Sequence, residues 1–381
     1  MDKSGIIVTI LAVVFIHVLV LSLALLPGCS SETQTEYRSE TVESTVSDFS
    51  FSNKETEIAK TAEKPAAEPV KKASSLFSPA PEPKALSLPK PKIRVPLAKQ
   101  PAPLNANSAV NGRILDLQTW HKKNPRNVSR VCGILIDLNS RKILWQHNAE
   151  KAVPIASLTK IMTLMLAYEK LQSPDCQIDL DTEIRITPEA RVVPPSGVMF
   201  RKEEISFPLR KLMIASAVKS ANDATYLIAQ TFGNGSADRF VEMMNSRARE
   251  LGMNRTTYHN PHGLPGKADR KPDNTSSIRD LAILCEAYLQ YPELHEWSSM
   301  AAATFRVKND LVNHNRLLRS GKFNTQGVSG IKTGFTLNAG TCLAAYCERN
   351  GRRMLAIMTG FNSAADRDTF AKNLLEWGYK K

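Results

Sequence analysis

The stretch IASLTKIMT at residues 155–163 decides how the rest of the chain is interpreted, because it places a serine and a lysine three positions apart at the start of an apolar run. On a helix, positions i and i+3 share a face, with Cβ atoms about 5–6 Å apart. The amine of Lys160 can therefore reach the hydroxyl of Ser157 and remove its proton. We predict that Ser157 is a nucleophile in the first turn of a buried helix.

A Ser-x-x-Lys pattern is weak evidence by itself, since average amino-acid usage yields about one such match in a chain of this length. Other matches include residues 87–90 in a proline-rich stretch and residues 216–219 at a predicted helix end. Neither is followed by the apolar run that is typical of a buried helix. The context of the motif, rather than the motif itself, singles out Ser157.

Composition excludes some classes of function. The 381 residues carry a formal net charge of +13, but no basic cluster has interleaved aromatic side chains, so we predict no nucleic-acid partner. A solvated surface facing an anionic cell wall is compatible with this charge. The six cysteines lack CxxC or metal-type spacing, which indicates mostly buried thiols. We predict no cofactor and no metal site, because His259 and His262 have no third ligand at usable spacing.

The N-terminal part predicts a membrane attachment. Residues 6–26 contain His17 as their only titratable side chain and are long enough to span a bilayer. The sequence LPGC at residues 26–29 resembles the lipobox of bacterial lipoproteins, in which the cysteine is lipidated after cleavage. We therefore assign residues 1–29 to a membrane anchor or a lipoprotein-type signal, and both alternatives remain open at this point.

Residues 30–112 have the composition of a tether. An acidic Ser/Thr/Glu half is followed by a Pro/Lys/Ala half that contains 10 of the 22 prolines. Such a segment buries too little apolar surface to form a core. At 5–6 Å × √n, some 80 residues give an end-to-end distance of roughly 50 Å. The rest of the chain, residues 113–381, is predicted to form the folded domain.

This domain shows the pattern of an α+β fold. Alternating residues at 131–138 and 143–146 predict a first hairpin, and runs at 341–347 and 354–358 flank an Asn-Gly turn signal that predicts a second. Apolar spacing predicts helices after Ser157 and over residues 208–220, 224–232, 237–251, 277–289 and 366–377, with loops or short strands over 179–201. Strands at both ends with helices between them predict one antiparallel sheet.

Two more motifs accompany the serine. Residues 220–222 are the only Ser-x-Asn in the sequence, and residues 332–334 are its only Lys-Thr-Gly. Ser-x-x-Lys, Ser-x-Asn and Lys-Thr-Gly in this order form the signature set of penicillin-binding proteins and class A β-lactamases.

The surrounding residues narrow the family. SANDA at 220–224, NPHGL at 260–264, GIKTG at 330–334 and LLEWG at 374–378 resemble the serine D-Ala-D-Ala carboxypeptidases, the low-molecular-mass penicillin-binding proteins of peptidase family S11. The likeness covers about residues 128–381. It implies a β-lactamase/transpeptidase-like fold, an antiparallel sheet flanked by helices with a helical subdomain.

The resemblance also implies roles for individual residues. Ser157 would attack the peptide carbonyl, Lys160 would be the base with a pKa lowered by burial and by Lys332, and Ser220 would relay a proton to the leaving group. The oxyanion hole would be the backbone N–H groups of Ser157 and Phe335. The implied substrate-binding set is Asn222, Lys332, Thr333, Gly334, Phe335, Thr336 and Arg367.

The implied activity is that of a DD-carboxypeptidase that removes the terminal D-alanine from peptidoglycan stem peptides through an acyl-enzyme. β-Lactams would acylate the same serine, and the enzyme would work in the cell envelope, on the periplasmic side of the membrane. A DD-endopeptidase acting on peptidoglycan crosslinks would use the same residues, so the sequence does not separate the two. A β-lactamase is disfavoured because Ala221 replaces the typical aspartate, and a penicillin-binding sensor without peptide hydrolysis is the remaining alternative.

Overall fold

The computed structural model describes residues 96–105, 130–194, 196–266, 271–308 and 310–381. The predictions for the membrane segment at residues 6–26 and for Cys29 lie outside these ranges, as does most of the predicted tether. Within the described residues, none of the helices combines the length and apolar character needed to cross a membrane.

An antiparallel sheet forms the centre of the described domain, with five strands in the order β2-β1-β11-β10-β9. The first predicted hairpin is β1 (Cys132–Asp137) with β2 (Lys142–His147), and the second is β10 (Gly340–Arg349) with β11 (Arg352–Phe361). Strand β9 (Lys332–Thr336) lies at the edge. Because β1 pairs with β11, the sheet unites the two ends of the domain, as predicted.

The turn between β10 and β11 has the predicted chemistry. Asn350 and Gly351 both have positive φ, 51° and 76°, the conformation that a two-residue turn of this kind requires. Both strands run closer to the turn than predicted. Glu348 lies opposite Arg353 across the hairpin. The strands therefore continue through a pair of oppositely charged residues, beyond the end of the apolar runs from which they were predicted.

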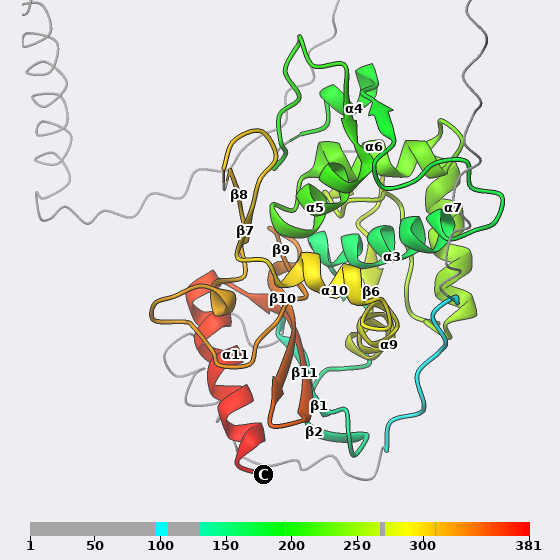
Figure 1. The fold of residues 1–381 in the computed structure, drawn as a ribbon. Coiled ribbons are helices and arrows are strands. Elements are labelled where there is room, and N and C mark those ends of the chain that lie inside the picture. Colours follow the sequence, from blue (N-terminus) through cyan, green and yellow to red (C-terminus); the bar gives the residue numbers. More distant parts are fainter. Residues whose placement is uncertain (1–95, 106–129, 195, 267–270, 309) are drawn as a thin grey trace, which may run out of the picture. The chain divides into compact units, whose positions relative to one another are not determined.

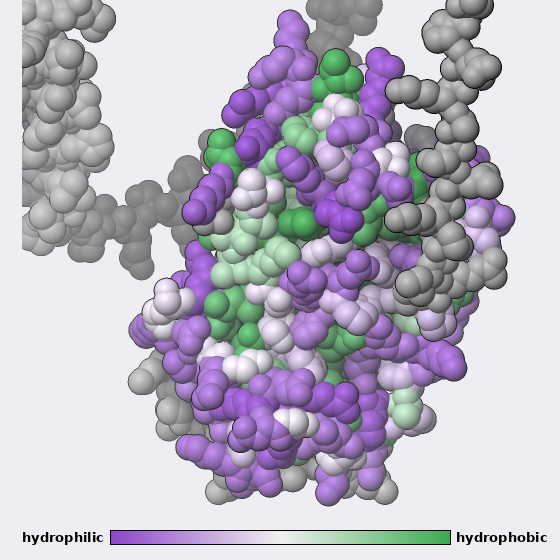
Figure 2. Space-filling view, viewed as in Figure 1, coloured by the Kyte–Doolittle hydropathy of each residue, from purple (hydrophilic) through white to green (hydrophobic). Residues whose placement is uncertain are grey.

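Different helices cover the two faces of the sheet (Figure 1). Ile134 of β1 joins the cluster formed with α3 (Thr159–Leu171) and α9 (Ile278–Tyr288), whereas its neighbour Leu135 joins the cluster formed with α11 (Ala364–Tyr379). Successive side chains of a strand point to opposite faces, so one alternating stretch serves both cores. Figure 2 shows hydrophilic residues over most of the visible face of the domain.

The helical subdomain packs around α3. Its main helices are α5 (Leu209–Val218), α6 (Asn222–Phe232) and α7 (Ala237–Glu250), each within a few residues of its predicted range. The sequence analysis missed α4 (Pro188–Arg191) and α10 (Pro292–Ser299). Both are too short to display a helical period and both start at a proline.

The remaining elements are short connections around these helices. They are β3 (Val153–Pro154), η3 (Ala156–Leu158), β4 (Glu183–Arg185), β5 (Ser206–Pro208), β6 (Thr275–Ser276), β7 (Ala302–Ala303), β8 (Leu311–Val312) and η4 (Arg316–Leu318). The described part of the range 179–201 therefore contains the short strand β4 and the short helix α4, where loops or short strands were predicted.

Residues 96–105 form a strap that lies against the helices. Ala98 is buried, its N–H donates to the hydroxyl of Tyr291 at 2.6 Å, and its carbonyl accepts from Arg247 at 2.7 Å. The Arg247 guanidinium also pairs with Glu169 of α3 at 2.8 Å. The sequence analysis includes these residues in the predicted tether, residues 30–112. Their composition gives no sign that Tyr291 and Arg247 form hydrogen bonds with the backbone of Ala98.

The cysteines of the described residues are thiols inside the fold. Cys132, Cys285, Cys342 and Cys347 are buried, in agreement with the prediction for most cysteines. Burial raises the pKa of Cys342 to about 12 and also raises the pKa of Cys285. Thiols with raised pKa values are poor nucleophiles. Within the described ranges, no group of three or more His, Cys, Asp or Glu residues is arranged to hold a metal ion.

Candidate active site

Ser157 lies in η3, a single 3-10 turn that runs directly into α3. The prediction placed it in the first turn of the helix itself, whereas the structure has a tighter 3-10 turn there. The preceding Ala156 has a φ of 47°. The i, i+3 relation survives this change. The Nζ atom of Lys160 lies 3.0 Å from the Oγ atom of Ser157. Backbone strain of this kind is concentrated at functional sites.

Lys160 is fully buried and has three oxygen neighbours. Besides Ser157, its Nζ atom lies 2.7 Å from Oδ1 of Asn222 and 2.6 Å from the carbonyl oxygen of His262. Both of these oxygens can only accept hydrogen bonds. A neutral amine that donates its two hydrogens to them has its lone pair left for the hydroxyl of Ser157. The geometry therefore suits a general base.

The electrostatics of the site favour this neutral form. Burial, followed by the positive charge of Lys332, holds the pKa of Lys160 well below its ordinary value, although Asp223 acts in the opposite direction. Burial and the nearby guanidinium of Arg367 lower the pKa of Lys332 to about 7. Desolvation disfavours the charged form of an amine, and a neighbouring cation adds to that effect.

Gly263 allows the loop at residues 260–264 to reach Lys160. A Cβ atom at this position would lie 1.9 Å from the carbonyl oxygen of Ala156, so only glycine permits this close approach to η3. Its φ of 82° also favours glycine. The sequence analysis used these residues as part of the family resemblance. It missed the contribution of the His262 carbonyl because a main-chain oxygen has no side-chain signature.

Ser220 lies in the connection between α5 and α6, and Asn222 is the first residue of α6. Ser220 has a φ of 60° and is 7% exposed, and its Oγ atom has no hydrogen-bond partner among the described residues. A buried hydroxyl without a partner invites a functional explanation. Asn222 donates its backbone N–H to the carbonyl of Ser196 at 2.7 Å, which ties the segment around Ser196 to the site.

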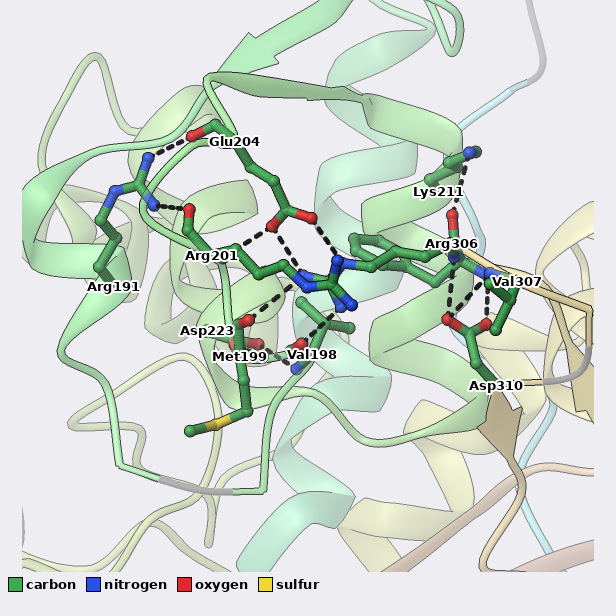
Figure 3. A network of polar contacts seen from close by, with 11 residues as sticks. Arg191, Val198, Met199, Arg201, Glu204, Lys211, Asp223, Arg306, Val307 and Asp310 are labelled. Carbon is green, nitrogen blue, oxygen red and sulfur yellow. Dashed lines mark hydrogen bonds and ion pairs between the residues drawn. The ribbon is translucent and has the colours of Figure 1, made fainter. Parts of the chain in front are cut away.

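Figure 3 shows how the segment at residues 196–199 is held in place. Two of its backbone N–H groups donate to the carboxylate of Asp223 at 3.0 and 2.8 Å. Arg306 donates to two of its carbonyl groups at 2.8 and 3.2 Å and pairs with Glu204 at 2.6 Å. Both charged groups therefore fix the backbone of this segment.

The Lys-Thr-Gly motif lies on β9, beside η3. A Cβ atom at Gly334 would be 3.0 Å from the backbone nitrogen of Ser157, so the glycine allows the strand to approach the nucleophile closely. As an edge strand, β9 has backbone groups on this side that no further strand uses. Lys332 is buried and donates to the carbonyl of Thr333 at 3.0 Å. The hydroxyl of Thr336 instead accepts from the N–H of Ala339 at 3.0 Å.

A cavity of about 550 Å³ opens in front of the nucleophile. Among the predicted site residues it is lined by Ser157, Ser220, Thr333, Gly334, Phe335 and Arg367. The lining residues that the sequence analysis missed are Ser196, His314, Arg316, Arg319, Thr341 and Ala364. Lys160, Asn222, Lys332 and Thr336 do not line it. The first three are buried, and Lys160 and Asn222 contact lining residues directly.

Arg367 lines this cavity from α11. Arg367 is only 3% exposed, and its guanidinium donates to the carboxylate of Asp368 at 2.7 Å and to the carbonyl of Cys342 at 3.1 Å. The structure therefore brings the predicted arginine to the cavity, with part of its hydrogen-bonding capacity already used.

Comparison with known proteins identifies the family. The family model described as peptidase S11, D-alanyl-D-alanine carboxypeptidase, matches residues 119–363. The chain belongs to the peptidase S11 family. This match confirms the predicted family and places all three motifs within its range.

Relatives in the S11 family share about a third of the aligned residues. D-alanyl-D-alanine carboxypeptidase DacF of Bacillus subtilis is 30% identical over 65% of this chain, which spans 62% of the length of that protein. A D-alanyl-D-alanine endopeptidase of Pseudomonas aeruginosa is 35% identical over 55% of this chain and 64% of its own length.

A solved S11-like structure supports the fold. Penicillin-binding protein D2 of Listeria monocytogenes, in its ampicillin-bound form, matches with a TM-score of 0.58 and 27% identity. The match covers 65% of this chain and 96% of that one. The predicted α+β fold, an antiparallel sheet with flanking helices, is confirmed.

Proposed function

We propose that this protein is a serine DD-carboxypeptidase that removes the terminal D-alanine from peptidoglycan stem peptides. The observation that carries the proposal is the 3.0 Å contact between Nζ of Lys160 and Oγ of Ser157, made by an amine whose pKa is strongly lowered. Membership of the S11 family and the likeness to the Bacillus subtilis carboxypeptidase give the substrate class.

Acylation begins when Lys160 takes the proton of Ser157 and the serine oxygen bonds to the carbonyl carbon of the penultimate D-alanine. The carbonyl oxygen becomes an oxyanion, for which the backbone N–H groups of Ser157 and Phe335 are the proposed donors. The C–N bond then breaks. The Lys160 ammonium returns its proton through the unpartnered hydroxyl of Ser220 to the departing amine, so free D-alanine leaves and an ester remains on Ser157.

Deacylation repeats these steps with water. Lys160 accepts a proton from the water molecule, whose oxygen bonds to the ester carbon. The ester C–O bond breaks, Ser157 regains a proton, and the shortened peptide leaves as a carboxylic acid. A β-lactam carbonyl would enter the same first step. The ampicillin-bound form of the Listeria monocytogenes relative supports this extension to β-lactams as inhibitors.

The substrate carboxylate is proposed to bind at β9 and α11. Thr333 and Arg367 line the cavity, and Lys332 supplies positive charge beneath them. Asn222 orients Lys160 at 2.7 Å and stands near the substrate amide in this assignment. Thr336 belongs to the predicted substrate-binding set. Its hydroxyl accepts from the N–H of Ala339, which leaves its O–H as the donor available to a carboxylate.

The direct test uses the full-length protein with monomeric pentapeptide muropeptides. Release of one free D-alanine per peptide, measured by a D-amino-acid oxidase assay and mass spectrometry, supports a carboxypeptidase. A protein that is labelled by fluorescent penicillin yet releases no D-alanine would be a binding sensor. Rapid turnover of penicillin without peptide hydrolysis would make it a β-lactamase.

A DD-endopeptidase is the second candidate, favoured by the 35% identity with the Pseudomonas aeruginosa endopeptidase. The same acylation would then cut the D-alanyl bond of a crosslink, with a second stem peptide as the leaving group. Incubation with crosslinked muropeptide dimers separates the two activities. Conversion of dimers to monomers without any free D-alanine from pentapeptides would replace the carboxypeptidase assignment.

The rate should depend on pH through both lysines. As the pH rises, Lys160 loses its proton and becomes the base, so kcat/KM increases. As the pH passes about 7, Lys332 loses the charge that attracts the carboxylate, so kcat/KM decreases. We expect a bell-shaped profile, and in Lys332→Arg the alkaline limb should move upward by more than two pH units because arginine stays charged.

The measured quantity is the pH at the midpoint of each limb of the profile. This midpoint does not depend on the absolute rate, which can be lower in Lys332→Arg because arginine has a different shape from lysine. Peptide hydrolysis is recorded between pH 5 and pH 10 for both proteins. An alkaline limb at the same pH in wild type and Lys332→Arg would show that Lys332 is not the group responsible.

We propose that residues 1–29 attach the enzyme to a membrane, with residues 113–381 outside the cytoplasm, where peptidoglycan lies. The support is the apolar segment at residues 6–26 together with the cell-wall chemistry of the S11 family. Deletion of residues 1–30 should move the protein from the membrane fraction to the soluble fraction. Mass spectrometry of the mature N-terminus then shows whether Cys29 is lipidated, and a deletion variant that still sediments with membranes would refute the assignment.

A further inference from the structure

We propose that Arg316 and Arg319 form a second anion-binding subsite of the active-site cavity, which binds a carboxylate on the leaving portion of the substrate, beyond the carboxylate held at Thr333 and Arg367. This inference rests on the proposed DD-peptidase function and deepens it. It predicts a preference for substrates whose leaving residue carries a second negative charge.

The shape of the cavity is the first argument. Arg316 and Arg319 line the cavity that contains Ser157, and they also line an adjoining cavity of about 260 Å³. The second cavity is completed by Ser320, Lys322 and Phe323. Because the same two arginines line both spaces, the active site continues past them. A larger leaving portion than a single alanine therefore has room.

The balance of charge is the second argument. Every charged side chain among the described residues that line these two cavities is basic. Asp368 is fully buried beside them and pairs with both Arg316 and Arg367, so one carboxylate serves two guanidinium groups. Arg319 makes no ion pair within the described part of the chain. A net positive charge thus remains for a ligand to neutralise.

Two contacts fix the orientation of the Arg316 side chain, as is needed for a residue that binds a ligand. Its Nε atom lies 2.5 Å from Oδ2 of Asp368, and its guanidinium stacks 4.1 Å from the ring centroid of Phe323. These two contacts fix the plane of the guanidinium. Its Nη2 atom is buried and has no hydrogen-bond partner among the described residues. A buried, oriented donor without an acceptor is suited to a carboxylate oxygen.

His314 lines the active-site cavity together with Arg316 and Arg319, and the nearby positive charges affect its pKa. Burial, and then the charges of Lys332, Lys219 and Arg319, lower the pKa of His314. The imidazole is therefore neutral at pH 7, which leaves the two arginines as the cations of this wall. The positive charges that add to the effect of burial on His314 are the same charges that attract an anion.

The position of the subsite assigns it to the leaving side. It adjoins Arg367 through their shared partner Asp368, and Arg367 is proposed to bind the carboxylate of the leaving residue. Free D-alanine has only that one carboxylate. A leaving residue with an acidic side chain, or the acidic stem peptide released from a crosslink, presents a second one to Arg316 and Arg319.

The experiment compares three synthetic peptides with the same acyl part, ending in D-Ala-D-Ala, D-Ala-D-Glu or D-Ala-D-Gln. D-Glutamate and D-glutamine differ in charge but hardly in shape. For the full-length wild type we expect kcat/KM to be about tenfold higher for D-Glu than for D-Gln, which corresponds to about 1.4 kcal/mol. The ratio should fall toward one in Arg319→Gln, and below one in Arg319→Glu.

Two controls separate charge at the subsite from general effects. Arg239→Gln removes the same charge from an exposed position on α7 and should keep the wild-type ratio. High ionic strength should reduce the ratio, since screening weakens an exposed charge pair. A D-Glu to D-Gln ratio near one in wild type, or an unchanged ratio in Arg319→Gln, would overturn the inference. Absence of hydrolysis of every peptide, including D-Ala-D-Ala, would instead refute the proposed function.

Discussion

Ser157→Ala should abolish both peptide hydrolysis and the attachment of fluorescent penicillin. The alanine has no oxygen to form the acyl bond, so only water-mediated background cleavage remains, and the loss of kcat is expected to be on the order of 10⁴-fold or more. Hydrolysis is followed as D-alanine release, and acylation is followed as a labelled band on a denaturing gel. Circular dichroism establishes that the variant is folded.

The matched control is Ser299→Ala, which removes a hydroxyl at the C-terminal end of α10, away from the residues that line the cavity. It should be labelled and hydrolyse peptide at wild-type rates. Labelling of the Ser157→Ala protein at the wild-type rate would mean that another residue carries the acyl group.

Lys160→Ala should slow acylation by about 10²–10⁴-fold, the contribution usual for a positioned general base. The serine hydroxyl then loses the amine that lies 3.0 Å from it, and the oxygens of Asn222 and His262 lose their donor. The rate of penicillin labelling in single-turnover experiments measures the step directly. Since an unsatisfied buried oxygen costs about 1–3 kcal/mol, a lower melting temperature should accompany the loss of rate.

Lys170→Ala provides the comparison on the same helix. Lys170 is exposed in the last turn of α3 and contributes nothing to the cavity. Its replacement should leave acylation unchanged. Wild-type labelling kinetics in Lys160→Ala would remove the proposed proton path, whatever the melting temperature.

Local patterns were sufficient to predict most of the fold. The Asn350-Gly351 turn fixes its hairpin through two positive φ angles, and the helices are recognised by their apolar spacing. The three motifs converge because β9 packs against η3 and because Asn222 and Ser220 follow α5 directly. The three motifs together predict that their residues meet in one site, because one reaction needs all of these residue types.

Contacts made by the main chain, or through space between distant segments, could not be predicted. The His262 carbonyl binds Lys160 through a backbone atom that every residue possesses. Arg316 and Arg319 belong to no motif and reach the cavity only because η4 packs beside α11. Thr336 was assigned by its place in the motif, but the hydrogen bond to Ala339 depends on the following turn.

The strap at residues 96–105 determines where a truncated protein can safely begin. Expression from residue 106 or 113 would keep both cores and all three motifs, yet Tyr291, Arg247 and Glu169 would lose the backbone of Ala98 as their common partner. Each of these lost hydrogen bonds costs about 0.5–1.5 kcal/mol. Glu169, which keeps its bonds to Arg247 and Tyr291, belongs to the helix that bears Lys160. A crystallisation or screening fragment should therefore start no later than Pro96.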